Sequence, residues 1–467
     1  MRHATIEPDR GRPLAPRRRG ALPSLGFLAT IVGSSCGGGL PAPAADFLIT
    51  NATVWTADPD HPRAEAIAMI GARIVAVGSN DEIAAWQGPD TSVVDGAGQL
   101  VLPGFNDAHI HLMQAGRRLL DEDEQVEDAT TPDARRAAGE RALAHAARLG
   151  VTSATDMGTT ADDVALFMEF AAEDALTLRL YLAPMETDWQ DQANVGIRRA
   201  FGSAFLRLGA LKGYVDGSVE SSTALFFEPY GDAPGSTGML TEEFTPFEDA
   251  HTRLSSADAS GLQIALHAVG DRAVSMALDL YEELSAIDPT RDRRLRIEHA
   301  QHLADADFDR FAELEVIASV QPYRAVDDGR WAEDRLGSER ARAGAAFRTL
   351  LDRGGRLALG TDWDGGPLDP MLTLHAAVTR ATLDGAHPDG WIPAQTLTLE
   401  EAVTAYTLGS AYAEFQESDK GSITVGKLAD LVMLDADIFA IDPTDLPTVS
   451  VVTTIVGGRV VYAAETP

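Results

Sequence analysis

The chain has 467 residues, and 38 Lys and Arg against 71 Asp and Glu give it a formal net charge of −33 at pH 7. This charge argues against nucleic acid or an anionic membrane face as a partner, because basic patches bind such surfaces. The hydrophobic fraction of 45% is typical of a globular protein, and the one cysteine excludes an internal disulfide and any metal site built from several cysteines.

The N-terminal residues 1–45 predict a secretory signal peptide and a tether. Arg17, Arg18 and Arg19 precede an apolar stretch over residues 21–33, and a run of small residues follows. This order is typical of an export signal, and the apolar stretch is short for a membrane span. We therefore expect an exported protein, periplasmic or extracellular; the alternative is a disordered N-terminal extension.

Cys36 has two interpretations. It comes directly after the apolar stretch, where a bacterial lipoprotein carries its acylated cysteine, but Gly33 stands where such a signal usually has leucine. We expect either a lipid anchor at Cys36 or soluble export after cleavage near Ala44.

Both ends of the folded part have the alternation and the turn residues of β-strands. Residues 46–100 contain strand-like segments such as 66–78, and residues 416–467 contain others such as 449–462. Neither end has enough strands for a stable sheet of its own. We therefore expect the two ends to pair and form one small β-sandwich.

Residues 101–415 alternate short apolar runs with amphipathic helical patterns. Eight units of this spacing predict an α/β fold, a (β/α)8 barrel of the TIM type; an open, doubly wound sheet is the alternative. The expected strands are 101–112, 151–157, 177–183, 206–215, 262–269, 295–299, 316–321 and 356–361. The expected helices include 132–149, 161–175, 272–287, 304–314 and 339–353.

Polar side chains capable of binding a metal lie in five of these strands, mostly at their ends. In a barrel of this type the C-terminal strand ends face one mouth, where active sites lie. These residues should therefore converge, although they are far apart in the chain. They are His109, His111, Lys212, His267, His299 and Asp362.

His109 and His111 are two positions apart, so on a strand both side chains point the same way. Neutral imidazoles are common ligands of zinc and related divalent ions; a pair in a solvated turn is the alternative. Asp362 could bind a metal and also act as general base. A hydroxide that bridges two metal ions can attack a carbonyl at neutral pH, and a carboxylate can pass its proton to a leaving amine.

Lys212 lies inside an expected interior strand of a chain with only two other lysines, Lys420 and Lys427. A buried charged lysine is costly unless it is paired. Carbamylation by carbon dioxide would turn its amine into an anionic ligand able to bridge two metals. The alternatives are a pair with Asp216 and a side chain that reaches solvent.

Seven motifs together form a recognisable pattern, which resembles the amidohydrolase superfamily over roughly residues 46–463. The most similar branch includes N-substituted formamide deformylase (amidohydrolase family 3). The resemblance implies a metal-dependent barrel with a β-sandwich built from both ends. The motifs are LPGFNDAHIH at 102–111, LKGYVDGS at 211–218, LHAVGDR at 266–272, RIEHAQH at 296–302, ASVQP at 318–322, LGTDW at 359–363 and GKLADLV at 426–432.

The resemblance assigns a role to each candidate by position. It implies that His109 and His111 hold a first metal ion, while Asp362 binds that ion and acts as the base. Carbamylated Lys212 would bridge to a second ion, held by the two remaining histidines. One or two divalent ions are expected, with zinc as the first candidate from the ligand set.

Three further residues are candidates for substrate contacts. Gln321 and Trp363 match positions near the pocket, and His302 is interpreted as a support for a ligand or as a substrate contact, with a solvated loop histidine as the alternative. The chain also departs from the family pattern: a short segment, 112–150, replaces a long insertion that helps to wall the pocket, and Arg324 stands where histidine is common. These departures affect the inference of the substrate from the family more than the inference of metal binding.

The sequence therefore predicts a metal-dependent hydrolase of a carbon–nitrogen bond in a non-peptide amide or a substituted formamide. The alternatives are a metal-dependent hydrolase of a lactone or a phosphotriester, and a non-catalytic envelope protein that binds a small molecule. We expect a small-molecule substrate, no nucleic-acid partner and, as the default for a soluble oligomer, a homodimer.

Overall fold

The strands form four sheets in the computed structural model, which describes residues 44–123, 131–382 and 384–465. The predicted signal peptide, with Cys36, lies outside these residues apart from its last two positions. Among the described residues, no helix combines the length and the apolar character that a membrane span requires.

Two of the sheets contain the strands nearest the chain ends. The four-stranded sheet has the order β5-β4-β1-β6, and the six-stranded sheet has the order β20-β19-β18-β7-β2-β3. The first comprises β1 (Phe47–Thr50), β4 (Ala66–Ile70), β5 (Arg73–Gly78) and β6 (Ser92–Asp95). The second comprises β2 (Thr53–Trp55), β3 (Arg63–Ala64), β7 (Leu100–Pro103), β18 (Leu431–Leu434), β19 (Val451–Val456) and β20 (Arg459–Ala463).

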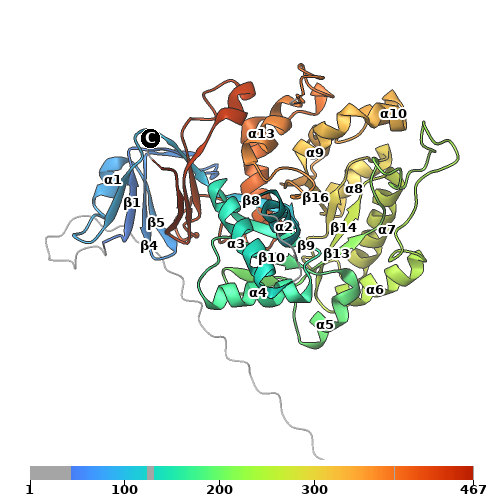
Figure 1. Cartoon of the computed structure of the whole chain (residues 1–467), viewed down its shortest axis with the longest axis horizontal. Helices are drawn as coiled ribbons and strands as arrows, with labels where there is room; N and C mark the ends of the chain where they lie inside the picture. Colours follow the sequence, from blue (N-terminus) through green and yellow to red (C-terminus); the bar gives the residue numbers. More distant parts are fainter. Residues whose placement is uncertain (1–43, 124–130, 383, 466–467) are drawn as a thin grey trace, which may run out of the picture. The chain divides into compact units, whose positions relative to one another are not determined.

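The two chain ends meet where β18 pairs antiparallel with β7, with Leu431 opposite Pro103 and Leu434 opposite Leu100. The N-terminal strands, in blue, and the C-terminal strands, in dark red, lie side by side in Figure 1. One apolar cluster joins Ile49 and Met69 of the four-stranded sheet to side chains of the six-stranded sheet such as Ile455. Both ends of the chain therefore contribute to one sheet and one core, in line with the expectation that neither end has enough strands for a sheet of its own.

The remaining strands form two five-stranded sheets, with the orders β11-β12-β10-β9-β8 and β13-β14-β15-β16-β17. Neighbouring strands are parallel, except that β11 is antiparallel to β12. The first sheet comprises β8 (Phe105–Ile110), β9 (Val151–Met157), β10 (Arg179–Ala183), β11 (Phe201–Gly202) and β12 (Leu206–Leu208). The second comprises β13 (Ala210–Tyr214), β14 (Gln263–Ala268), β15 (Arg296–His299), β16 (Ile317–Val320) and β17 (Arg356–Leu359).

Isolated parallel bridges join the two five-stranded sheets at two places. Ile110, at the end of β8, bridges to Trp363 after β17, and Met185, after β10, bridges to Lys212 on β13. The parallel strands are buried along nearly their whole length, as is typical of parallel sheets that are covered on both faces.

Each of the eight expected strands is present, but two of them are divided. The run 101–112 contains β7 and β8, which belong to different sheets. The run 206–215 is interrupted at Gly209, whose φ of +110° disfavours any residue with a side chain. A Cβ there would lie 2.1 Å from the carbonyl oxygen of Arg198, so the close approach of that loop also requires glycine.

Helices follow most of the parallel strands. The expected helices 132–149, 161–175 and 272–287 correspond to α3, α4 and α7, and the region 339–353 contains two short helices, α11 and α12. The α-helices of the described residues are α1 (Asn80–Ala84), α2 (Leu112–Asp123), α3 (Pro132–Arg148), α4 (Ala161–Ala172), α5 (Trp189–Asn194), α6 (Phe247–Ala259), α7 (Asp271–Ile287), α8 (Phe308–Glu313), α9 (Pro322–Asp327), α10 (Ala332–Leu336), α11 (Ser338–Arg342), α12 (Phe347–Asp352), α13 (Pro370–Thr379), α14 (Leu399–Thr404) and α15 (Ser410–Ala413).

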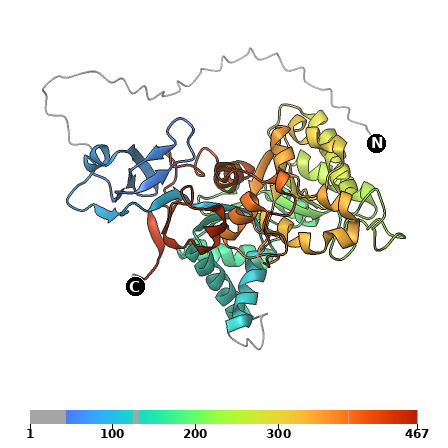
Figure 2. The same ribbon diagram turned by 90° about the horizontal axis from the view of Figure 1, so that it is seen from above.

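The short segment between β8 and β9 forms two helices that pack on one another, α2 and α3, shown in teal in Figure 2. Helix α3 begins at Pro132, and the hydroxyl of Thr131 caps it by accepting a hydrogen bond from the amide of Ala134 at 3.2 Å. Proline at the first turn and a threonine cap are the signals that the sequence provides for a helix start.

Candidate metal centre

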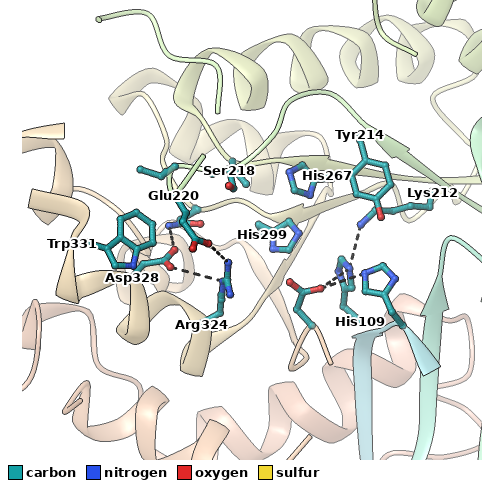
Figure 3. Close-up of a pocket in the computed structure, with 15 residues that line it drawn as sticks. His109, Lys212, Tyr214, Ser218, Glu220, His267, His299, Arg324, Asp328 and Trp331 are labelled. Atoms are coloured by element: carbon teal, nitrogen blue, oxygen red, sulfur yellow. Dashed lines mark hydrogen bonds and ion pairs between the residues drawn. The ribbon is translucent and has the colours of Figure 1, made fainter. Parts of the chain in front are cut away.

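All six residues predicted to bind metal line one cavity of about 190 Å³. Five of them lie at or beyond the C-terminal ends of their strands, and the sixth, Lys212, lies within β13. Figure 3 labels four of them, His109, Lys212, His267 and His299, and shows His267 and His299 between the Lys212 side and the Arg324 side of the view. The convergence that the sequence predicted is therefore present.

Two imidazoles and one carboxylate form the tightest group in this cavity. The ligand atoms of His109, His111 and Asp362 all lie within 4.8 Å of one another. The Nε2 atoms of both histidines are 3.4 Å from the same carboxylate oxygen, Oδ1 of Asp362. Two imidazole nitrogens and a carboxylate oxygen are a donor set that suits a divalent ion such as zinc.

The backbone fixes this group through contacts between the ends of β8 and β17. The amide of Asp362 donates to the carbonyl of His109 at 2.9 Å, and the amide of His111 donates to the carbonyl of Trp363. Buried Asp107 strengthens the junction, because its Oδ1 accepts from the amides of His109 and Thr361, both at 3.0 Å. Two segments far apart in sequence are thus held at a fixed register.

The Nδ1 atoms of both histidines face acceptors. Nδ1 of His109 is 2.8 Å from Oε2 of Glu298, and Nδ1 of His111 is 2.8 Å from the carbonyl oxygen of Met157. An ionised carboxylate and a carbonyl can only accept, so each Nδ1 carries the hydrogen and each Nε2 keeps a lone pair. Those lone pairs point to the side of the ring where Asp362 lies.

The electrostatics favour the protonation states that metal binding requires. Burial and nearby Lys212 lower the pKa of His109 to about 4, and burial lowers the pKa of His299 to about 3. Burial alone would raise the pKa of Asp362, but the close approach of the His111, His109 and His299 side chains brings it well below its usual range. Neutral imidazoles and an ionised carboxylate are the forms that bind a cation.

Lys212 is completely buried, and its Nζ lies 3.2 Å from Nε2 of His109 and 4.6 Å from the centroid of the Tyr214 ring. Burial lowers its pKa to about 8. Neither alternative for this lysine is met. It does not reach solvent, and Asp216 instead accepts hydrogen bonds from the amides of residues 225, 269 and 270 at 2.7–3.0 Å.

His267 and His299 lie next to this group. Their ring centroids are 4.5 Å apart, and the His299 ring is 5.0 Å from that of His109. Nε2 of His267 is 3.0 Å from the carbonyl oxygen of Gly217. The three imidazoles therefore form a contiguous row in the cavity wall, and their role in a second metal site stays a prediction.

The three predicted substrate contacts do not line this cavity, although Gln321 lines a small pocket that shares His299 and Arg324 with it. Gln321 is 4% exposed and donates to the carbonyl of Ser319 at 3.2 Å. Trp363 stacks on His145, with ring centroids 5.2 Å apart, and buried His302 packs edge-on against Phe226. None of the three residues is among those that line the cavity, so their contact with a substrate stays a prediction.

Sequence reasoning missed the far end of the cavity and the partner of His109. Glu220, Gln301, Arg324, Asp328 and Trp331 line that end, and only Arg324 had been noticed, as a departure from the family pattern. Glu298 lies on β15 two positions after Arg296. Two charged residues at alternate positions of a buried strand were the available signal, because such charges must be paired.

Comparison with known proteins places this fold and site in a family. A family model with the description "Amidohydrolase family" matches residues 118–462. The chain belongs to the amidohydrolase family. The matched region of this amidohydrolase includes Lys212, His267, His299 and Asp362, and it begins after His109 and His111.

Two curated relatives and one solved structure illustrate the range of the likeness. The amidohydrolase is 30% identical to Protein LONG AFTER FAR-RED 3 of Arabidopsis thaliana, over 90% of this chain and 92% of the relative. It is 29% identical to N-substituted formamide deformylase of Arthrobacter pascens, over 56% of this chain and 46% of that enzyme, and thus matches about half of that enzyme's length. An uncharacterized metal-dependent hydrolase from Pyrococcus horikoshii OT3 has a similar fold, with a TM-score of 0.75 at 23% identity, over 85% of this chain and 99% of that one.

Proposed function

We propose that this amidohydrolase is a metal-dependent enzyme that hydrolyses a carbon–nitrogen bond in a small non-peptide amide or substituted formamide. The observation that carries the proposal is the convergence of His109, His111 and Asp362 in a cavity that three further candidate ligands line. The substrate class is supported by the name of the Arthrobacter pascens relative. The cavity, of about 190 Å³, suits a small-molecule substrate.

We further propose that the two five-stranded sheets supply the strands of one (β/α)8 barrel. The two isolated parallel bridges, at Ile110–Trp363 and at Met185–Lys212, support this arrangement because they connect the sheets on both sides. The barrel would span residues 101–415, and residues 46–100 and 416–467 would form the β-sandwich. Active sites of such barrels lie at the C-terminal strand ends, where the cavity is found.

The donor atoms fit a divalent metal. His109, His111 and Asp362 would hold one ion, and His267 and His299 would hold a second, with zinc favoured by nitrogen and carboxylate ligands. A bound divalent ion supplies Lewis acidity, which polarises a carbonyl oxygen and lowers the pKa of water. We separately propose that the protein is exported, with or without acylation of Cys36, and that it forms a homodimer.

Lys212 is the residue we propose as a carbamate. The ammonium would first lose a proton to water. The neutral Nζ would then attack the carbon of carbon dioxide, a nitrogen–carbon bond would form as a carbon–oxygen π bond breaks, and a second proton would pass from the nitrogen to water. The product is an anion in place of a cation. This change suits the position of Nζ, 3.2 Å from Nε2 of His109, because an ammonium there faces a group of metal ligands.

Asp362 is the residue we propose as the general base. Its carboxylate stays ionised at neutral pH, and its Oδ1 faces two imidazoles that are not available as bases while they bind metal. It would accept a proton from the attacking water and return it to the nitrogen of the leaving amine. The walls of the cavity would keep bulk water away from the reacting bond.

A substrate panel tests the proposed function. The full chain, loaded with zinc, is assayed with N-substituted formamides, N-acyl amines, lactones and phosphotriesters, and amine, acid and alcohol release are each measured. We expect amine release that disappears on chelation and returns with zinc. Release of acid or alcohol from lactones or phosphotriesters alone would contradict the carbon–nitrogen specificity. No turnover of any compound by metal-loaded protein would favour a small-molecule-binding protein.

A further inference from the structure

Strand β15 buries an ion pair next to the candidate metal centre. Arg296 and Glu298 are both completely buried, and they occupy alternate positions of the strand, so their side chains point to the same side. Nε of Arg296 donates to Oε1 of Glu298 at 2.7 Å, and its Nη2 donates to Oε2 at 3.1 Å. This two-point contact fixes the plane of the carboxylate.

The two terminal nitrogens of Arg296 also contact three other strands. Nη2 lies 2.6 Å from the carbonyl oxygen of Ala108 on β8 and 3.2 Å from the hydroxyl of Ser319 on β16, and Nη1 donates to the hydroxyl of Thr155 on β9 at 3.3 Å. The position of the guanidinium is therefore determined by the sheets and not by Glu298 alone.

A buried ion pair of this kind is not explained by stability. Removing two charges from water costs several kcal/mol per ion, and apolar residues of similar volume are often as stabilising. The pair instead makes a specific contact with a candidate metal ligand: Oε2 of Glu298 lies 2.8 Å from Nδ1 of His109. Nδ1 of His111, the other histidine of the candidate group, meets the uncharged carbonyl of Met157.

We propose that Glu298 is a positioning residue for the metal centre, which fixes His109 in the Nδ1–H tautomer with Nε2 directed at the metal, and that Arg296 holds Glu298 in place. The inference rests on the proposed metal site. A ligating imidazole whose other nitrogen donates to a carboxylate is oriented and made more basic, and loss of such a partner costs 10–100-fold in metal affinity. The orientation and tautomer of His109 would thus depend on the charge of the Glu298 carboxylate, whereas Nδ1 of His111 faces an uncharged carbonyl.

The test compares two variants with a matched control. Glu298→Gln removes the charge and keeps the shape. The double variant Arg296→Met with Glu298→Leu removes the whole ion pair and leaves no unpaired buried charge. The control is Arg179→Met with Asp430→Leu, which removes another buried ion pair, with Nε and Oδ2 2.7 Å apart, that does not line the cavity.

Zinc affinity is measured by competition with a chromophoric chelator, unfolding by thermal denaturation, and the His109 tautomer by nitrogen NMR of histidine-labelled protein. We expect both Glu298 variants to bind zinc 10–100-fold more weakly than wild type, while the control keeps wild-type affinity. In the NMR spectrum, His109 should be the Nδ1–H form in wild type and a mixture in both Glu298 variants.

Wild-type zinc affinity and an unchanged tautomer in a folded double variant would overturn the proposal, and Glu298→Gln decides it if the double variant does not fold. A wild-type protein that binds no zinc would refute the proposed function. In that case the tautomer still decides the role of Glu298, because it is measured without metal.

Discussion

Nζ of Lys212 lies 3.2 Å from Nε2 of His109, and neither side chain is exposed to solvent. A fully protonated ammonium is a poor neighbour for an imidazole that binds a cation. On the proposed metal site, we therefore expect Lys212 to be modified or uncharged when the metal centre is complete.

Replacement of Lys212 by alanine should remove metal and activity together. We expect lower zinc content per chain and a loss of amine release, with partial recovery when a short carboxylic acid is added, because the acid can occupy the place of the carbamate. Elemental analysis and the amine assay measure both effects, and carbon NMR of protein equilibrated with labelled bicarbonate detects the carbamate in the wild type. Lys427→Ala is the control, since Lys427 bonds to the carbonyls of Glu417 and Lys420 away from the cavity. Full zinc and full activity in the Lys212 variant would exclude the bridging role.

Removal of the metal should lower stability as well as activity. A zinc ion that binds only the folded chain would raise the free energy of unfolding by about 2.7 kcal/mol at a free concentration one hundred times Kd. We expect thermal denaturation to shift to higher temperature when zinc is added to chelated protein. In Asp362→Asn the shift should be smaller, and amine release should fall by about 10²–10⁴-fold, the usual contribution of a general base. An equal zinc-induced shift in the variant would show that Asp362 is not a ligand.

The far end of the cavity should select substrates by charge. Nη1 of Arg324 donates to the carbonyl of Gly365 at 3.0 Å, while its contacts to Glu220 and Asp328 are longer, at 3.5 Å and 3.8 Å. Several of its donors can therefore take a carboxylate on the substrate. A hydrogen bond to a charged group contributes about 1.5–3 kcal/mol, so Arg324→Gln should raise KM for an anionic formamide tenfold or more and change KM little for a neutral one of the same size.

Glu220→Gln provides the opposite control for this prediction. The Glu220 side chain is 67% exposed and competes with a substrate anion for Arg324. KM for the anionic formamide should fall or stay unchanged in this variant. An equal rise of KM for neutral and anionic substrates in Arg324→Gln would mean that Arg324 holds the Gly365 loop and does not read substrate charge.

Much of the site could be predicted from the sequence because its residues lie at regular places. His109, His267 and Asp362 are polar residues at the ends of apolar runs, and parallel strands bring their C-terminal ends to one face. Lys212 could be singled out for a different reason: it is one of only three lysines in the chain, and it lies inside a predicted interior strand. These signals depend on local pattern and on one rule of topology.

What the sequence did not reveal depends on contacts that no local pattern encodes. Strands β7 and β8 are one apolar run, and hydrophobicity does not indicate that the chain changes sheets at Gly104. Glu220 and Trp331 lie in the segments that follow the strands, where no period predicts which side chains turn into a cavity. Trp363 is next to Asp362 in the chain, yet it stacks on His145 and does not line the cavity. The backbone at Asp362 has a φ of +57°, so the alternation of side chains along a strand does not apply there.

Acid should destabilise the metal-free protein through its buried histidines. Burial lowers the pKa of His302 to about 4, and its Nε2 has no hydrogen-bond partner among the described residues. The folded state therefore keeps this imidazole neutral at pH values where the unfolded chain, with the ordinary pKa of 6.5, already binds a proton. The stability it contributes is fully present above pH 6.5 and is lost as the pH falls towards 4, at about 1.4 kcal/mol per pH unit for one proton.

Urea denaturation of chelated protein between pH 7 and pH 4.5 measures how the free energy of unfolding depends on pH. In His302→Gln the slope of this free energy against pH should be smaller, by the amount that corresponds to about one proton taken up on unfolding. The exposed His61, with a side chain 84% accessible, provides the control substitution His61→Gln. His109 and His299 are shifted in the same direction by burial, so a residual slope should remain in the His302 variant. An unchanged slope in His302→Gln would mean that His302 is protonated in the folded protein and has found a partner for its Nε2.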